Sequence, residues 1–296
     1  MIVLFSKKNR LFVVFINTIL LVLFLSGCQT RPTALSTEMN NAFNHRFKEA
    51  IIDTPHFSVY TRLPNQPPHN DTLRVYIEGD GNAWIRRSRI SQNPTPKNRL
   101  MHRLMLQDTK QDIAYIARPC QFIRPSHTCV PDAWTFSRYD PVMVNTINEV
   151  IDRIIKNKYQ KIELVGFSGG ATIALGLTAL RNDITSIRTV AGNLDPAYVN
   201  QWHHVTPMPT AIDTLTLANT LKKIPQRHFI GKKDRIIPYE IYQHYHRNIP
   251  SLCITHTIVD NASHGHGWEA HWESLLKEPL PCTDPRHPAS GPMPVK

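Results

Sequence analysis

The 296-residue sequence predicts an α/β fold with a doubly wound, mainly parallel sheet and a small cap or none. Two observations support this prediction. Segments of strand and helix character alternate from residue 73 to residue 277, as they do in a sheet built from strand–helix–strand units. Within them, an apolar strand at 161–165 leads through a glycine-rich turn into a small-residue helix. Ligands of such sheets bind beyond the carboxyl ends of the strands, so functional residues are expected in the loops there.

The first 28 residues have the features of an export signal. Lys7, Lys8 and Arg10 precede an apolar run at 11–25, which is too short for a typical membrane span. The run ends in Leu25-Ser26-Gly27-Cys28, which resembles the signal of bacterial lipoproteins. This resemblance implies cleavage before Cys28 and lipidation of that cysteine. An ordinary signal peptide or an N-terminal anchor helix is the alternative interpretation.

The lipoprotein interpretation divides the chain into four parts. They are a signal peptide at 1–27, a tether at 28–55, one α/β domain at 56–282 and a proline-rich tail at 283–296. Gln29, in place of an aspartate after the lipidated cysteine, implies the periplasmic face of the outer membrane in the bacterial cell envelope.

The basic charge of the chain suits such a location. Removal of the signal peptide takes away three positive side chains and no acidic one, which lowers the net charge from +11 to +8. A basic surface favours anionic lipid head groups or sugars as partners. Nucleic acid is not an expected partner, because the chain is exported and carries no nucleic-acid motif.

Four cysteines remain besides Cys28, and an even number in an exported protein indicates two disulfides. Of the three possible pairings we favour two specific bridges. Cys120 and Cys129 are close together within one loop, and Cys253 and Cys282 flank the last strand and helix. Free buried thiols are the alternative.

Hydrophobic periodicity places the individual elements. Strands are expected at 57–61, 73–77, 113–117, 161–165, 187–191, 228–231 and 253–259. Helices are expected at 98–107, 141–154, 171–180, 214–221, 238–247 and 268–276, with a short one at 43–50. Only about 36 residues separate the strands at 187–191 and 228–231, so any cap over the site is small. We find no internal repeat and no second-domain boundary.

The turn Gly166-Phe167-Ser168-Gly169-Gly170 fits the nucleophile elbow, G-x-S-x-G. The elbow holds its serine on a strained turn, and glycines two residues away on either side allow the strand and helix to approach closely. The start of the helix behind Ser168 directs free N–H groups at an oxyanion formed there. A glycine-rich turn with an exposed serine is the alternative interpretation.

A serine hydroxyl needs a base, and the base needs a third group to orient it. Asp234 follows the strand at 228–231 and His264 follows the strand at 253–259, so the chain order is Ser, acid, His. Asp195 is a rival acid, and Asp234 has the alternative role of a helix cap. His266 is the rival base, although the nearby helix start disfavours a charged imidazole there.

These motifs in this order resemble the α/β-hydrolase superfamily. Within it, Glu78-Gly79-Asp80-Gly81, Arg118-Pro119-Cys120-Gln121 and the helix opened by Trp268 resemble a group of little-characterised bacterial hydrolases. The resemblance covers about residues 56 to 282. In this group the histidine lies four positions before the tryptophan, which implies that His264 is the base.

The resemblance also implies that the backbone N–H groups of Asp80 and Gly169 form the oxyanion hole. The superfamily often has a His-Gly sequence at the first of these positions, so an aspartate is a departure. A free carboxylate beside a developing oxyanion would oppose catalysis. Because Arg118 ends the strand expected next to this loop, we predict that it pairs with Asp80. The alternative is that both side chains point to solvent.

The predicted function is that of a membrane-tethered extracytoplasmic serine hydrolase that cleaves a carboxylic ester: a lipid, acyl or thioester substrate. No cofactor is implied. The chain has 15 histidines, but none, including His203, His204, His244 and His246, belongs to a set with metal-ligand spacing. Two alternatives stay open: a catalytically silent hydrolase-fold lipoprotein that binds an envelope partner, and an amidase or peptidase with the same triad.

Overall fold

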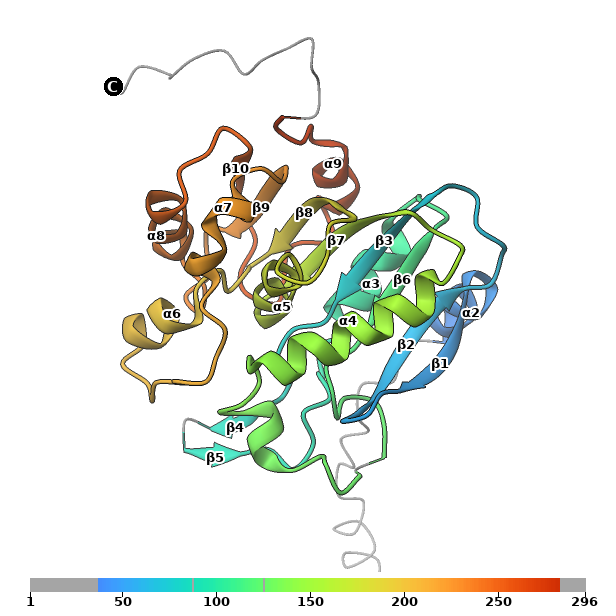
Figure 1. Ribbon diagram of the computed structural model, residues 1–296, viewed down its shortest axis with the longest axis horizontal. Helices are drawn as coiled ribbons and strands as arrows, with labels where there is room; N and C mark the ends of the chain where they lie inside the picture. The colour runs from blue at the N-terminus through green and yellow to red at the C-terminus, as the bar shows by residue number, and fades with distance from the viewer. Residues whose placement is uncertain (1–36, 87, 125, 283–296) are drawn as a thin grey trace, which may run out of the picture. The chain divides into compact units, whose positions relative to one another are not determined.

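The computed structural model describes residues 37–86, 88–124 and 126–282 (Figure 1). The predicted signal peptide, Cys28 and the tail at 283–296 lie outside these residues. The main sheet consists of β1 (Phe47–Asp53), β2 (Ser58–Pro64), β3 (Thr72–Ile77), β6 (Ile113–Ile116), β7 (Lys161–Phe167), β8 (Ile184–Val190), β9 (Gln226–Gly231) and β10 (Ile254–Val259). A separate hairpin is formed by β4 (Trp84–Arg86) and β5 (Arg89–Ile90).

The order of strands across the main sheet is β1-β2-β6-β3-β7-β8-β9-β10. The six strands from β6 to β10 in this order pair in parallel, and β2 joins β6 in antiparallel register. The predicted doubly wound, mainly parallel sheet is therefore confirmed. Since parallel strands share their direction, the loops after β3, β6, β7, β8, β9 and β10 emerge at one edge.

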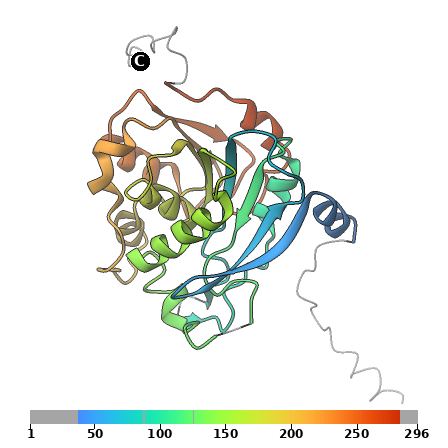
Figure 2. The same ribbon diagram turned by 45° about the vertical axis from the view of Figure 1, so that its right-hand side comes forward.

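Helices cover both faces of the sheet (Figures 1 and 2). One face carries α4 (Pro141–Ile155), α5 (Gly169–Leu177) and α8 (Tyr239–Asn248), and the other carries α2 (Thr37–Arg46), α3 (Leu100–Gln107) and α9 (Trp272–Lys277). Strand β3 shows how the sequence serves both layers. Val75 and Ile77 pack into the first core, while the intervening Tyr76 meets the ring of Trp272 in the second.

The predicted tether at 28–55 is too long, because its second half is folded. Helix α2 buries Phe43, and β1 pairs with β2 over its whole length and buries Phe47. Strand β1 lies at the edge of the sheet and exposes most of its residues, so its sequence has little apolar alternation to reveal it.

Three further differences concern the site. The last helix begins at Trp272, four residues after the predicted Trp268. The segment at 191–225 contains an unpredicted helix, α6 (Pro196–Trp202), besides η2 (Thr214–Leu217) and α7 (Ala218–Leu221), which replace the single predicted helix at 214–221. The β4–β5 hairpin was also not predicted. Among the described helices, none is long and apolar enough to cross a membrane.

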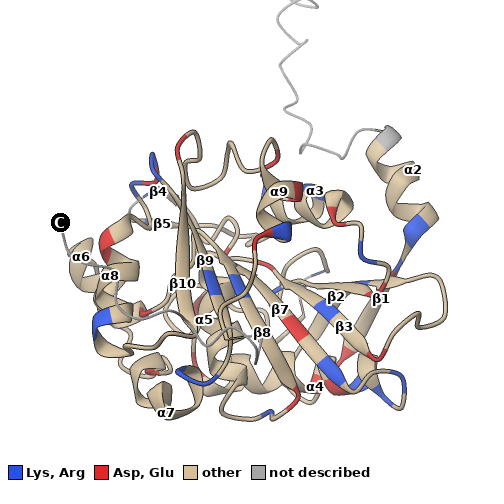
Figure 3. Cartoon of the chain, turned by 90° about the horizontal axis from the view of Figure 1, so that it is seen from above, with Lys and Arg blue, Asp and Glu red and all other residues tan. Residues whose placement is uncertain are grey.

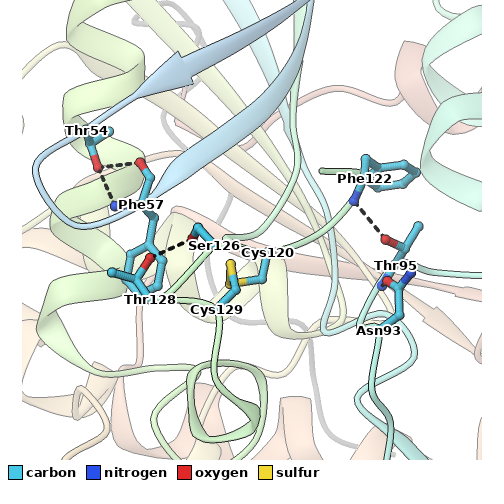
Figure 4. Close-up of a disulfide and its surroundings, with 9 residues drawn as sticks. All are labelled: Thr54, Phe57, Asn93, Thr95, Cys120, Phe122, Ser126, Thr128 and Cys129. Atoms are coloured by element: carbon cyan, nitrogen blue, oxygen red, sulfur yellow. Dashed lines mark hydrogen bonds between the residues drawn. A yellow bond between two sulfur atoms is a disulfide. The ribbon is translucent and has the colours of Figure 1, made fainter. Parts of the chain in front are cut away.

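Both predicted disulfides, Cys120–Cys129 and Cys253–Cys282, are present. The first bridge closes residues 120–129 of the long loop that follows β6. The short helix η1 (Pro131–Trp134) comes directly after the bridge in the same loop. Figure 4 shows this bridge beside the hydrogen bond from the Phe122 N–H to the Thr95 hydroxyl, which is 2.8 Å long. The loop is thereby held against the segment after the β4–β5 hairpin.

Candidate active site

Ser168 stands on a sharp turn between β7 and α5. Its backbone has φ 50° and ψ −121°, a strained conformation for a residue other than glycine. A Cβ added at Gly170 would lie 2.4 Å from the Ile77 carbonyl oxygen, and one at Gly166 would lie 2.7 Å from the Ala171 nitrogen. Both glycines are thus required by the close approach of strand and helix, as the elbow motif predicts.

Two hydrogen bonds connect Ser168 to a histidine and an aspartate. His264 Nε2 lies 3.0 Å from Ser168 Oγ, and His264 Nδ1 lies 2.9 Å from Asp234 Oδ2. The second oxygen of Asp234 accepts the backbone N–H groups of Ile236 and Ile237, at 2.8 and 2.9 Å. Asp234 is only 4% exposed, so this carboxylate is fixed in place and serves both the loop before α8 and the imidazole.

The loop carrying His264 is anchored by Trp268. The buried indole donates to the carbonyl oxygens of Ser263 and His264, at 2.8 and 3.3 Å. The Asn98 amide donates to the Gly265 carbonyl at 2.6 Å. Trp268 therefore positions the loop that carries His264. The prediction that Trp268 begins the last helix is wrong, because that helix begins at Trp272.

The rival acid and the rival base lie in other surroundings. The Asp195 carboxylate caps α6 through the Tyr198 N–H, and it lies 3.2 Å from His244 Nε2. The His266 side chain is exposed to solvent. The structure therefore brings Asp234 and His264 to the serine, and it gives Asp195 a different partner.

Asp80 is held by three side chains, two of which the sequence analysis missed. Arg118 donates to its Oδ1 at 3.2 Å, as predicted, and Arg138 donates to its Oδ2 at 2.9 Å. The Tyr139 hydroxyl also donates to Oδ2, and burial, followed by the charge of Asp80, raises the pKa of Tyr139 to about 12. Arg138 and Tyr139 lie in an irregular segment between η1 and α4, where no periodic pattern points to the site.

This cluster touches the elbow. A Cβ added at Gly169 would lie 2.0 Å from Asp80 Oδ1, so the carboxylate sits directly against the first residue of α5. Two guanidinium groups face this one carboxylate, so its negative charge is offset. Asp80 is therefore not a free carboxylate: it has the predicted partner Arg118 and a second cation, Arg138.

Glu78 fixes the peptide before Asp80. Its buried carboxyl accepts the Gly79 N–H at 2.9 Å and the Tyr115 hydroxyl at 2.8 Å. Gln121 donates to the Gly79 carbonyl on the other side, at 2.9 Å. Burial raises the pKa of Glu78 to about 7, an effect that the Tyr115 hydrogen bond reduces.

Comparison with solved structures gives the same architecture at low sequence identity. An esterase from Pyrococcus furiosus has a TM-score of 0.56 and 13% identity, over 82% of this chain and 93% of its own. The esterase domain of a Rhodothermus marinus protein has a TM-score of 0.51 and 14% identity, over 78% and 96%. The acylaminoacyl peptidase of Pyrococcus horikoshii has a TM-score of 0.54 and 11% identity, over 81% of this chain and 42% of its own.

This chain has the α/β-hydrolase fold. Neither a comparison with protein-family models nor one with curated proteins finds a match.

In this α/β-hydrolase fold, Ser168 lines a pocket of about 490 Å³. Ser168, Asp80 and Asn193, which follow β7, β3 and β8, are among the residues that line it. The remaining lining combines apolar and polar side chains. It comes from the β4–β5 hairpin, the segment before α4, helix α6 with the loop after it, and the loop before α8. These residues are Trp84, Phe136, Arg138, Tyr139, Val199, Asn200, His203, His204, Val205, Thr206, Met208, Ile236 and Ile237. The small cap expected from the sequence is therefore α6 and its following loop.

The described part of the chain contains no group of three histidine, cysteine, aspartate or glutamate side chains suited to a metal ion.

Glu78 should give the stability of this hydrolase fold a measurable pH dependence. Its pKa is higher in the folded protein than its ordinary value of 4.5, so the folded state binds the proton more tightly. The free energy of unfolding should therefore fall as the pH rises from about 4.5 to about 7, by about 3 kcal/mol in total. Glu78→Gln keeps the shape and removes the titration, so urea denaturation of both proteins isolates the effect. Equal pH dependence in the two proteins would show that Glu78 does not titrate as stated.

Proposed function

We propose that this protein is a serine hydrolase that cleaves carboxylic esters through an acyl-enzyme. The observation that carries the proposal is the continuous hydrogen-bonded series Asp234–His264–Ser168, whose serine lines a pocket with many apolar side chains. The nucleophile, the base and the orienting acid each come from a loop at the same edge of the sheet, and the nucleophile lines a pocket there.

The proposed reaction has two halves. Ser168 Oγ attacks the ester carbonyl carbon while His264 Nε2 takes the hydroxyl proton, and Asp234 stabilises the imidazolium. Collapse of the tetrahedral intermediate breaks the bond to the alcohol, which leaves with the proton from His264. Water then attacks the acyl group on Ser168 by the same steps and releases the acid.

The oxyanion of each tetrahedral intermediate would be held by the backbone N–H groups of Gly169 and Asp80. The positive charge of Arg118 and Arg138 supports this role, since it outweighs the Asp80 carboxylate nearby.

Turnover of a panel of short-chain aryl esters and matched aryl amides by the full chain in detergent tests the proposal. We expect ester hydrolysis that Ser168→Ala removes. Hydrolysis of amides in preference to esters would instead identify an amidase or peptidase. Absence of turnover on both, with a folded protein, would support the silent lipoprotein.

We also propose that Cys28 is lipidated and anchors the protein at the periplasmic face of the outer membrane. The support comes from the sequence Leu25-Ser26-Gly27-Cys28 and from Gln29. Cys28→Ala should abolish incorporation of radiolabelled palmitate and leave the signal peptide uncleaved, which gel mobility and mass spectrometry of the full chain would show. Labelling that persists in the variant would refute the anchor.

A further inference from the structure

Several large apolar side chains that line or adjoin the pocket face solvent. Phe136, Val205 and Ile236 line the pocket and are nevertheless 38%, 43% and 53% exposed. Trp202, at the end of α6 and next to the pocket residue His203, is 41% exposed. We call these four residues the pocket rim. They come from three separate segments, so their exposure is not a property of one helix or loop with an unusually apolar sequence.

Large apolar side chains grouped on a surface mark a binding face, whereas scattered ones need no explanation. The chain contains scattered examples, such as Leu252 in the turn before β10. That turn lies at the opposite edge of the sheet from the site, because β10 begins at Ile254 and runs toward His264. The rim differs because three of its members line the same pocket and the fourth, Trp202, adjoins the lining residue His203.

Three exposed arginines lie beside the rim, and one exposed carboxylate, that of Asp132, accepts the Ser137 hydroxyl next to Phe136. Arg86 and Arg89 on the β4–β5 hairpin, which carries the pocket residue Trp84, and Arg235 beside Ile236 are exposed. Figure 3 shows the hairpin marked by basic residues. The described residues of the segments 84–90, 136–139, 202–208 and 235–237 include no aspartate or glutamate. An apolar rim bordered by arginines matches the surface of a bilayer with anionic head groups.

We propose that the pocket rim docks onto an anionic lipid bilayer and that the pocket takes acyl esters of membrane lipids directly from it. The proposed substrate depends on the serine hydrolase activity proposed above. The proposed docking depends only on the rim. In docking, the rim side chains enter the interface between head groups and acyl chains, the arginines meet the lipid phosphates, and the acyl group enters the apolar walls toward Ser168.

The anchor proposed at Cys28 would hold the protein near a membrane. Nine residues lead from Cys28 to Thr37, the first residue of α2, and a chain of this length spans at most about 30 Å. The tether would therefore keep the first residue of α2 within about 30 Å of the membrane.

Quenching of tryptophan fluorescence by brominated lipid tests docking. The full chain with Ser168→Ala is reconstituted into vesicles of phosphatidylglycerol and phosphatidylcholine, with or without bromine on the acyl chains. The chain has five tryptophans, of which Trp134, Trp268 and Trp272 are buried and Trp84 is half-buried. We expect bromine to lower the emission and Trp202→Phe to remove most of that loss. Ile236→Glu should also reduce the loss, whereas the matched control Leu252→Glu should not.

Two results would overturn docking: emission that brominated lipid leaves unchanged, and quenching that Trp202→Phe or Ile236→Glu does not reduce. The first would favour a protein partner for the rim. Because Ser168→Ala is used throughout, docking is measured without turnover, and its failure is separate from failure of the hydrolase proposal.

The substrate is tested with the active full chain. We expect the rate on a vesicle-borne lipid ester, relative to that on a soluble aryl ester, to fall by about tenfold in Ile236→Glu compared with Leu252→Glu. An unchanged ratio would contradict delivery of substrate from the bilayer, even if the soluble ester is hydrolysed.

Discussion

Ser168→Ala and His264→Ala are each expected to lower kcat/KM on a short-chain aryl ester by about 10⁴-fold or more. The 3.0 Å contact between Ser168 Oγ and His264 Nε2 makes the pair one functional unit. Removal of either member stops proton transfer from the nucleophile, so the double variant should be no worse than the single ones. Initial rates of the three variants measure this directly.

His266→Ala and Asp195→Asn are the controls for this result. The His266 side chain is exposed, and the Asp195 carboxylate caps α6 and contacts His244, so neither variant removes part of the proton-transfer series. Both should retain most of the activity. If His266→Ala were inactive and His264→Ala active, the assignment of the base would be wrong, while the hydrolase proposal would stand.

Arg118→Ala is expected to lower kcat by about 10²-fold with little change in KM. Its guanidinium is buried and donates to Asp80 Oδ1, next to Gly169. Without it, the Asp80 carboxylate keeps only Arg138 as a charged partner, and its negative charge opposes the oxyanion that forms in the transition state. Steady-state kinetics on the aryl ester separate kcat from KM.

Asp80→Asn in the Arg118→Ala background provides the matched test of cause. Asparagine keeps the backbone N–H proposed for the oxyanion hole and removes the charge, so the double variant should recover much of the lost rate. A double variant as slow as Arg118→Ala would show that Arg118 acts on structure instead of charge. Unchanged kinetics in Arg118→Ala would remove its role altogether.

The core of the site could be predicted from the sequence because its signals are local or follow chain order. Gly166 is required by backbone contacts within the turn, and Gly170, which contacts the backbone of Ile77 and Glu78 at the end of β3, belongs to the same local G-x-S-x-G motif. Asp234 and His264 each follow a strand with a clear apolar pattern, and parallel strands bring their carboxyl ends together. The Asp80–Arg118 pair follows from the same rule, because β3 and β6 are neighbours.

What the sequence did not reveal depends on tertiary contacts without a periodic signal. Arg138 and Tyr139 reach Asp80 from an irregular segment, and nothing in their surroundings marks them as partners. Helix α6 has only seven residues and begins with a proline, so its pattern is too short to recognise. Trp268 looks like the start of a helix, but its indole is needed in the loop to bind two carbonyl groups.

The most direct test of the account is the position of a covalent adduct with a fluorophosphonate probe. Such a probe reacts with a serine that a neighbouring base activates, and it requires no knowledge of the natural substrate. Peptide mapping by mass spectrometry of the labelled full chain should place the phosphonate on Ser168, with labelling lost in Ser168→Ala and strongly reduced in His264→Ala. A folded chain that takes up no label, or carries it on another serine, would contradict the assignment of Ser168 as the nucleophile.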